Sequence, residues 1–163
     1  MPLKPITAES ASRLTALVIG PAGIGKTSLL RTIPEGERAC TLSAEGGLLC
    51  VRDLVQAGQV EGFEIGALAD FKDAYAFLST DATAKERYRW IFIDSLTEIA
   101  GRCVEVFQAK YPDKGDSYNL WGGYTDTMTS LIKAFRDLQP YNVVFTCLEE
   151  KDKDEVIRFY YAP

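Results

Sequence analysis

A glycine-rich segment near the start of the chain constrains the fold more than any other feature of the sequence. Gly20-Pro-Ala-Gly-Ile-Gly-Lys-Thr27 fits the pattern G-x-x-x-x-G-K-[ST]. The apolar run Leu14–Ile19 precedes it and is typical of a buried parallel strand, and the residues from Lys26 favour a helix that ends before Pro34. Strand, glycine loop and helix in this order are the context in which the pattern forms a phosphate-binding loop.

The loop predicts a site for the phosphates of a nucleotide. Its glycines let successive backbone N–H groups turn toward phosphate oxygens, and the N-terminus of the following helix adds positive potential. The Lys26 ammonium is expected to reach the β- and γ-phosphates, and the Thr27 hydroxyl to bind Mg²⁺. The guanine-reading pattern Asn-Lys-x-Asp does not occur, which favours ATP. The predicted ATP-binding residues are Gly20, Pro21, Ala22, Gly23, Ile24, Gly25, Lys26, Thr27 and Ser28.

The rest of the chain alternates between strand-like and helix-like segments. Further strands are predicted at residues 39–43, 60–65, 89–93, 141–148 and 156–161. Further helices are predicted at residues 48–57, 70–78, 96–110 and 119–138. Interleaved strands and helices predict an α/β fold with three layers, in which a mostly parallel sheet carries helices on both faces. The length of 163 residues fits one domain, residues 1–163.

Composition excludes several classes of function. The chain contains no histidine, which removes imidazole bases, His-ligated zinc and the nucleophilic triads that need an imidazole. With 18 Lys and Arg against 23 Asp and Glu the net charge is −5, so no overall positive field attracts nucleic acid or an anionic membrane. No signal peptide or membrane-spanning run is evident, which predicts a cytoplasmic protein without a membrane partner. The cysteines form no C-x-x-C pair and are predicted to be reduced core residues: Cys40, Cys50, Cys103 and Cys147.

Two acidic residues follow predicted strands. Asp94 ends the apolar run Trp90–Ile93, the shape of a Walker B element whose aspartate holds Mg²⁺ through water. The alternative is that Asp94 or Ser95 caps the next helix. Glu45 follows the strand at 39–43 and precedes two glycines, so its carboxylate has room to orient or deprotonate the water that attacks the γ-phosphate. The alternative for Glu45 is an exposed glutamate in a turn.

Polar residues near the C-terminus suggest further roles. Thr146 lies near the end of a predicted strand, where its hydroxyl could sense the γ-phosphate or the attacking water, although threonine is also a common strand residue. Lys151 and Lys153 lie two apart on an extended segment and therefore point the same way. They could stabilise charge on the transferring phosphate of a neighbouring subunit, or they could belong to a solvated charged turn.

Aromatic residues gather between Tyr111 and Tyr124 together with glycines and a lysine. Such a segment could stack unpaired bases, and it could equally be a loop whose aromatic rings pack back on the core.

With these residues in this order, the sequence resembles the RecA-like P-loop ATPases. Among them it is similar to small phage nucleotide-binding proteins that look like minimal recombinases acting in single-strand annealing. The resemblance implies that Glu45 is the catalytic glutamate, Asp94 the Walker B acid and Thr146 the sensor. It also implies that Lys151 and Lys153 are fingers that act across a subunit boundary.

The resemblance covers Leu14–Pro163 and implies Mg²⁺-dependent ATP hydrolysis coupled to single-stranded DNA binding or annealing in phage recombination. It implies ATP and ADP as ligands, a homo-oligomeric ring or filament, and the cytoplasm of the host cell. It also implies further sheet and DNA-contacting segments after Pro163, so residues 1–163 are expected to be a RecA-like core.

The sequence also fits two other functions. The first is a non-hydrolysing module in which ATP only orders surfaces for a partner, with Glu45 a plain loop residue. The second is a small-molecule kinase, which is less favoured because the arginines are not grouped in a lid-like insertion: Arg87, Arg89, Arg102 and Arg136.

Overall fold

The sheet consists of five parallel strands. The computed structural model describes residues 13–112, 117–151 and 157–159. In the sheet the strands follow the order β1-β5-β4-β2-β3. Their bounds are Thr15–Gly20 (β1), Ala39–Ser43 (β2), Val60–Glu64 (β3), Trp90–Asp94 (β4) and Asn142–Lys151 (β5). A sixth strand, β6 (Ile157–Phe159), runs antiparallel against the end of β5. The predicted α/β class with a mostly parallel sheet is confirmed.

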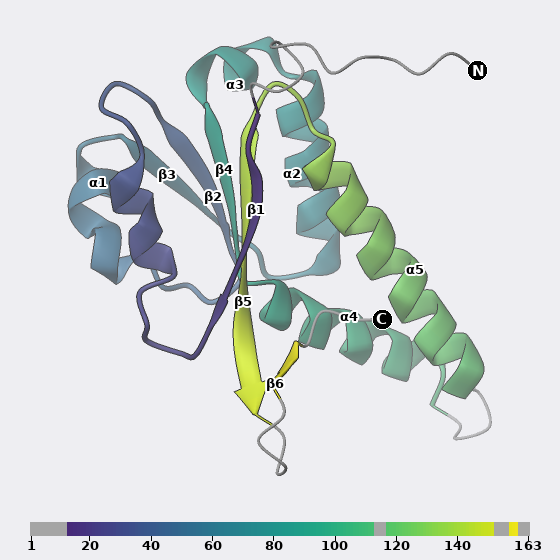
Figure 1. Ribbon diagram of the computed structural model, residues 1–163. Helices are drawn as coiled ribbons and strands as arrows, with labels where there is room; N and C mark the ends of the chain where they lie inside the picture. The colour runs from purple at the N-terminus through teal and green to yellow at the C-terminus, as the bar shows by residue number, and fades with distance from the viewer. Residues whose placement is uncertain (1–12, 113–116, 152–156, 160–163) are drawn as a thin grey trace, which may run out of the picture.

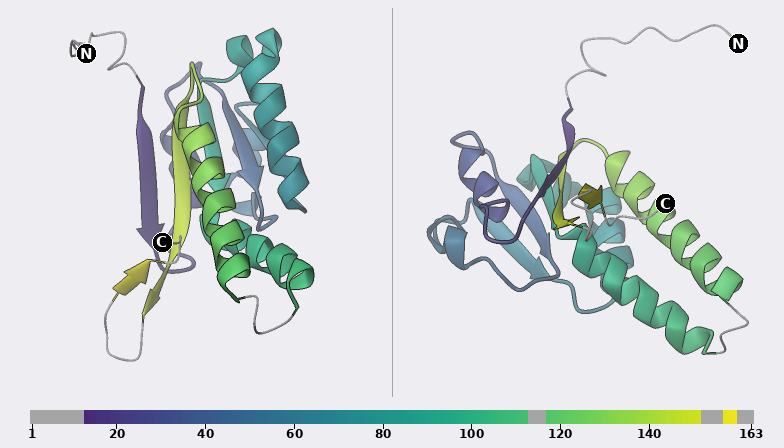
Figure 2. Two further views of the ribbon diagram at one scale, coloured as in Figure 1. Left: turned by 90° about the vertical axis from the view of Figure 1, so that its right-hand side faces the viewer. Right: turned by 60° about the horizontal axis from the view of Figure 1, so that its bottom comes forward.

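Helical segments cover both faces of the sheet (Figures 1 and 2). The glycine-loop helix η1 (Thr27–Thr32), η2 (Leu49–Val51) and α1 (Arg52–Gln56) lie on one face. The helices α2 (Leu68–Thr80), α4 (Leu96–Lys110) and α5 (Ser117–Arg136) lie on the other face, and the short α3 (Ala82–Arg87) lies near the amino ends of the strands. Within the described residues, no helix combines the length and the apolar composition that a membrane span requires.

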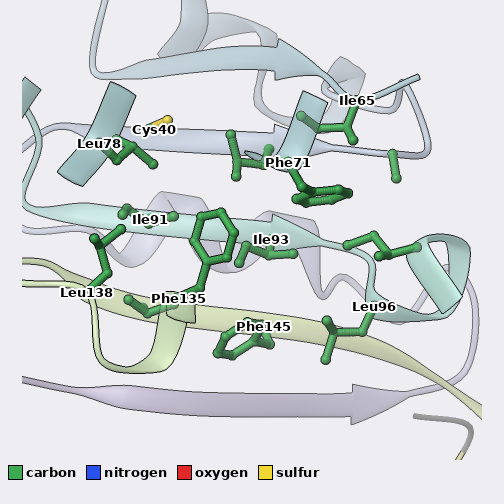
Figure 3. Close-up of a cluster of buried hydrophobic side chains, with 14 of the residues drawn as sticks. Cys40, Ile65, Phe71, Leu78, Ile91, Ile93, Leu96, Phe135, Leu138 and Phe145 are labelled. Atoms are coloured by element: carbon green, nitrogen blue, oxygen red, sulfur yellow. The ribbon is translucent and has the colours of Figure 1, made fainter. Parts of the chain in front are cut away.

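Each face of the sheet has its own apolar core. Along β4, Ile91 and Ile93 belong to the larger core under α2, α4 and α5, whereas Phe92 belongs to the smaller core under η1 and η2. This alternation follows from the two-residue period of a strand. In the larger core the Phe71 and Phe135 rings meet edge to face, with centroids 6.2 Å apart (Figure 3). Burial on both faces explains the nearly continuous apolar runs of the central strands.

The strand order determines which residues meet at the functional edge. All five parallel strands point their carboxyl ends toward the same edge, at the bottom of Figure 1. Strand β5 lies between β1, which leads into the glycine loop, and β4, which ends in Asp94. The end of β5 is therefore placed between the loop and Asp94, and the end of β2 lies beside Asp94 on its other side.

The helix predicted after the glycine loop is present but is wound more tightly than an α-helix. Residues Thr27–Thr32 form a 3₁₀ helix, with bonds such as Ser28 N–H to the Gly25 carbonyl at 3.0 Å. The segment ends at Ile33, which is extended because Pro34 disfavours a helical conformation in the residue before it. Short 3₁₀ pieces of this kind are common where a helical segment is confined between breaks.

Other elements differ from prediction in extent. Strand β1 is only partly buried, with Leu17 39% exposed, because β5 is its only partner among the described strands; Leu14, just before the strand, is 49% exposed. Helix α2 begins before the predicted Asp70, whose carboxylate accepts from the Gly66 and Ala67 amides from inside the first turn. Residues 48–57 split into η2 and α1. Helix α3 was not predicted, although its cap, the Asp81 carboxylate, is of an ordinary type.

The aromatic segment proves to be mostly helical. Residues 113–116 lie outside the described residues, and α5 begins at Ser117. Tyr124 is buried, as the packing alternative predicted, whereas Tyr118 and Trp121 are 87% and 53% exposed. Of the four rings in the segment, Tyr124 therefore belongs to the core, the half-buried Tyr111 stacks on Phe107, and Tyr118 and Trp121 face solvent.

The packing of α5 on α4 can be tested by measuring stability. A side chain on Gly123 would collide with the Phe107 ring, whereas Gly122 has nothing within 4 Å of the equivalent position. We expect Gly123→Ala to lower the free energy of unfolding by about 1–2 kcal/mol. Alanine has a higher helix propensity than glycine by up to ~1 kcal/mol, but the overpacking against Phe107 costs more than this gain. Gly122→Ala, the matched control, should raise it by up to ~1 kcal/mol. Chemical denaturation measures both, and equal effects of the two variants would contradict the packing of α5 on α4.

Candidate functional site

The glycine loop forms a cradle around the Lys26 side chain. Gly23 and Gly25 have φ values of 75° and 98°, in the left-handed region that favours glycine. Lys26 is 9% exposed, and its Nζ donates to the carbonyls of Gly20 and Pro21 at 2.9 Å each. The ammonium is thus held within the loop, next to the turn whose amides would face phosphate oxygens.

Asp94 is the meeting point of three elements. Its Oδ2 accepts a hydrogen bond from Thr27 Oγ1 at 2.6 Å, and its Oδ1 accepts one from Thr146 Oγ1 at 2.5 Å. The carboxylate is nearly buried, with Asp94 4% exposed, and it faces the glycine loop rather than helix α4. Ser95 is the N-cap residue of α4, but its side chain makes no capping bond. The geometry therefore brings together the two residues proposed for Mg²⁺ and the residue proposed as sensor.

The donor set suits a hard divalent cation. Hydroxyl and carboxylate oxygens from Thr27 and Asp94 are ligands that Mg²⁺ accepts, directly or through water, together with phosphate oxygens. Ser43 is the β2 register partner of Asp94, and its buried hydroxyl has no hydrogen-bond partner among the described residues. An orphaned buried hydroxyl beside the carboxylate fits a site completed by ordered water. Among the described residues, no group of three or more histidine, cysteine, aspartate or glutamate side chains is placed to hold a metal ion.

Glu45 lies at the rim of the same site. A cavity of about 580 Å³ opens between the glycine loop, the end of β2 and the start of α4. Glu45 is exposed there, and its Oε1 accepts a hydrogen bond from Ser95 Oγ at 2.5 Å. The residues lining the cavity are Ala22, Gly23, Gly25, Lys26, Thr27, Ser28, Ala44, Glu45, Cys50, Asp94, Glu98 and Leu148.

The two lysines proposed as fingers are not brought into this site by the described structure. Lys151 is the last residue of β5, and its side chain is outside the described residues; Lys153 lies outside them altogether. Strand β5 continues past its pairing with β1, which ends at Leu148, and pairs with β6 instead (Figure 1).

A family comparison agrees with this geometry. A family model described as an AAA domain matches residues 12–160, nearly the whole chain. The chain belongs to the AAA domain family. An AAA domain is a P-loop nucleotide-binding unit, and the glycine loop, the Thr27–Asp94 pair and the cavity between them are the candidate nucleotide site of this chain. A search of curated proteins gives no match to this AAA domain.

Three polar residues next to the candidate site were missed by sequence reasoning. Ser95 directly follows Asp94 and Ser43 lies two residues before Glu45, but serine is too common at strand ends to signal a role. In the sequence Arg102 is only one of four arginines that do not form a lid-like group, yet in the structure it donates to the carbonyls of Ala44 and Ile65. Its spacing of seven residues from Ser95 places both on one face of α4, a signal that becomes useful only once the partner of α4 is known.

The cysteines divide into three buried thiols and one exposed thiol. Cys40, Cys103 and Cys147 are buried, as predicted, and burial raises the pKa of Cys40 to about 12. The prediction was wrong for Cys50, which is exposed on η2 and lines the cavity beside the glycine loop. The reason is that η2 is a single short turn whose buried member is Val51.

This arrangement predicts nucleotide-sensitive labelling. We expect a maleimide reagent to modify Cys50 first under native conditions, and ATP with Mg²⁺ at ten times its dissociation constant to slow that reaction by about tenfold. Peptide mass spectrometry measures the rate, and the Lys26→Ala variant serves as the control without protection. Labelling of Cys50 that nucleotide does not slow in a protein saturated with ATP would contradict the placement of the cavity.

Proposed function

We propose that this chain hydrolyses ATP with Mg²⁺, releasing ADP and inorganic phosphate. The observation that carries the proposal is the convergence of Lys26, the Thr27–Asp94 pair and Glu45 on one cavity of about 580 Å³. A nucleotide-binding module without turnover would need only the glycine loop. A carboxylate on the far rim of the cavity, with one oxygen that makes no hydrogen bond within the described residues, is what hydrolysis adds to that requirement.

The chain's own residues divide the chemistry between them. The loop amides and the Lys26 ammonium bind the phosphates, and Lys26 exchanges its bonds to the Gly20 and Pro21 carbonyls for bonds to phosphate oxygens. Thr27 and Asp94 would hold Mg²⁺, which when bound neutralises charge on the β- and γ-phosphates. Glu45 orients a water molecule and accepts its proton as the oxygen attacks the γ-phosphorus and the bond to the ADP oxygen breaks. Thr146 fixes the Asp94 carboxylate through its hydroxyl.

The test is phosphate release by the purified protein with ATP and Mg²⁺, with the Lys26→Ala variant as the blank. Hydrolysis that requires both Lys26 and Mg²⁺ would support the proposal. Tight ATP binding without Lys26-dependent phosphate release would instead favour the non-hydrolysing module, and transfer of phosphate to a nucleoside or sugar in preference to water would favour a kinase.

Coupling to single-stranded DNA, as in phage recombination, is a second candidate function. It comes from the resemblance to RecA-like annealing proteins, and one feature favours it: Tyr118 and Trp121 are exposed near the start of α5 (87% and 53%). Exposed rings of this kind can stack on unpaired bases. The net charge of −5 works against phosphate contacts, so stacking would have to supply much of the affinity.

A titration with fluorescent oligothymidine in the presence of ATP and Mg²⁺ tests this coupling. If Tyr118 and Trp121 stack on bases, alanine at each should weaken binding by about 1–3 kcal/mol. Phe77→Ala, which removes an exposed ring of α2 (40% exposed), is the control and should leave binding unchanged. Absence of oligonucleotide binding, or no change in ATP turnover when it binds, would remove this candidate.

We also propose that the chain assembles into a homo-oligomer in which Lys151 and Lys153 reach the nucleotide of a neighbour. The extension of β5 supports this, because β5 carries Lys151 beyond the end of β1, the strand that leads into the glycine loop of the same chain. Mixing an inactive Lys26→Ala subunit with a Lys151→Ala, Lys153→Ala subunit should restore turnover at mixed boundaries. Mixtures with no more activity than the separate variants, or a protein that is monomeric with ATP bound, would exclude trans-acting lysines.

A further inference from the structure

Helix α4 contacts the Glu45 carboxylate at its first turn. Ser95, the N-cap residue of α4, is completely buried, and its Oγ donates to Glu45 Oε1 at 2.5 Å. The same hydroxyl makes no capping bond to its own helix. Glu45 Oε2 makes no hydrogen bond within the described residues, so one carboxylate oxygen is held and the other is left to accept a proton.

The same helix also holds the backbone just before Glu45. Arg102, two turns after Ser95, donates to the Ala44 carbonyl at 2.8 Å and to the Ile65 carbonyl at 2.5 Å. These carbonyls follow the ends of β2 and β3. Because residues seven apart lie on one face of a helix, a single face of α4 binds both the carboxylate of Glu45 and the peptide group in front of it.

The chain after Glu45 offers no comparable support. Gly46 and Gly47 follow directly, and a side chain at either position would meet nothing within 4 Å. Gly46 has a φ of 68°, in the left-handed region that favours glycine, so the chain turns here without packing against a neighbour. Among the described residues, the Glu45 carboxylate is held by Ser95, and the peptide before it is held by Arg102 at the Ala44 carbonyl and by the Asp94 carbonyl at the Ala44 amide.

We propose that Ser95 and Arg102 are positioning residues for Glu45: Arg102 anchors the peptide that carries it, and Ser95 turns its carboxylate so that Oε2 faces the nucleotide cavity. This inference rests on the proposed ATP hydrolysis, because it assigns to α4 the task of holding the general base of that reaction.

The test separates turnover from binding in a matched set of variants. We expect Ser95→Ala and Arg102→Met each to lower kcat by about 10- to 100-fold, as loss of an orienting partner commonly does. KM and the equilibrium affinity for ATP with Mg²⁺ should stay within about twofold, because the loop and Lys26 are untouched. Ser95→Thr, which keeps the hydroxyl, should recover most of the turnover. Arg136→Met removes an exposed arginine that pairs with Asp137 and should change neither quantity.

A second arm of the experiment uses Glu45→Gln as the reference. If Ser95 acts through Glu45, adding Ser95→Ala to Glu45→Gln should lower kcat no further. Wild-type turnover in Ser95→Ala, a combined loss of kcat and ATP affinity, or additive effects in the double variant would overturn the positioning role. If Glu45→Gln itself hydrolyses ATP at the wild-type rate, the proposed role of Glu45 fails and this inference fails with it. If Glu45→Gln loses ATP hydrolysis while Ser95→Ala and Arg102→Met keep the wild-type rate, the proposed function stands and only the positioning role is lost.

Discussion

Glu45→Gln is expected to lower the rate of ATP hydrolysis by about 10²- to 10⁴-fold, the usual contribution of a general base. The amide cannot take a proton from the attacking water, but its carbonyl oxygen can still accept the hydrogen bond from Ser95. The affinity for ATP with Mg²⁺ should remain close to that of the wild type. Phosphate release at saturating ATP measures the first quantity, and isothermal titration calorimetry measures the second.

Glu64→Gln is the matched control for this prediction, since it neutralises an exposed carboxylate at the end of the neighbouring strand β3. It should leave turnover unchanged. Equal turnover in Glu45→Gln and wild type would contradict the base role, whereas ATP binding without turnover in either protein would favour the module that binds ATP without hydrolysing it.

Asp94→Asn is expected to abolish the dependence of ATP affinity on Mg²⁺. It should also lower turnover by about 10²- to 10³-fold, which is the usual effect of removing one preorganised electrostatic group from an active site. The carboxylate supplies the negative charge that would hold the cation, and an amide of the same shape does not. The fold should survive, because the hydroxyls of Thr27 and Thr146 can rotate to suit the amide.

Mn²⁺ binding followed by electron paramagnetic resonance, with and without ATP, checks the Asp94 prediction independently of activity. Asp137→Asn serves as its control, since that carboxylate is exposed and pairs with Arg136. Unchanged Mn²⁺ binding in Asp94→Asn at saturating ATP would place the cation elsewhere.

The parts of the fold that sequence could predict are those set by local patterns. The glycine loop between Leu14–Ile19 and the following helix, and the apolar run that ends in Asp94, are each recognisable within a dozen residues. Helix 96–110 was predicted with the bounds that the structure has. The type and length of these segments depend on hydrophobic periodicity and on residues that end a helix or strand, and both can be recognised from neighbouring residues in the sequence.

The parts that could not be predicted depend on the order of the strands. That Thr146 would donate to Asp94 follows from β5 lying between β1 and β4, and no local pattern encodes that order. The contacts of Ser95 and Arg102 with the Glu45 segment likewise join residues about 50 positions apart. The exposure of Cys50 was missed because burial on a single turn depends on which side faces the sheet.

The most direct test of the account is a crystal structure with Mg²⁺ and a non-hydrolysable ATP analogue. The account predicts that the triphosphate lies in the glycine loop, with Lys26 Nζ bonded to phosphate oxygens in place of the Gly20 and Pro21 carbonyls. It also predicts the Glu45 carboxylate, still held by Ser95, within reach of the γ-phosphate through one water molecule. A triphosphate bound outside the loop, or a Glu45 carboxylate turned away from the γ-phosphate, would contradict it.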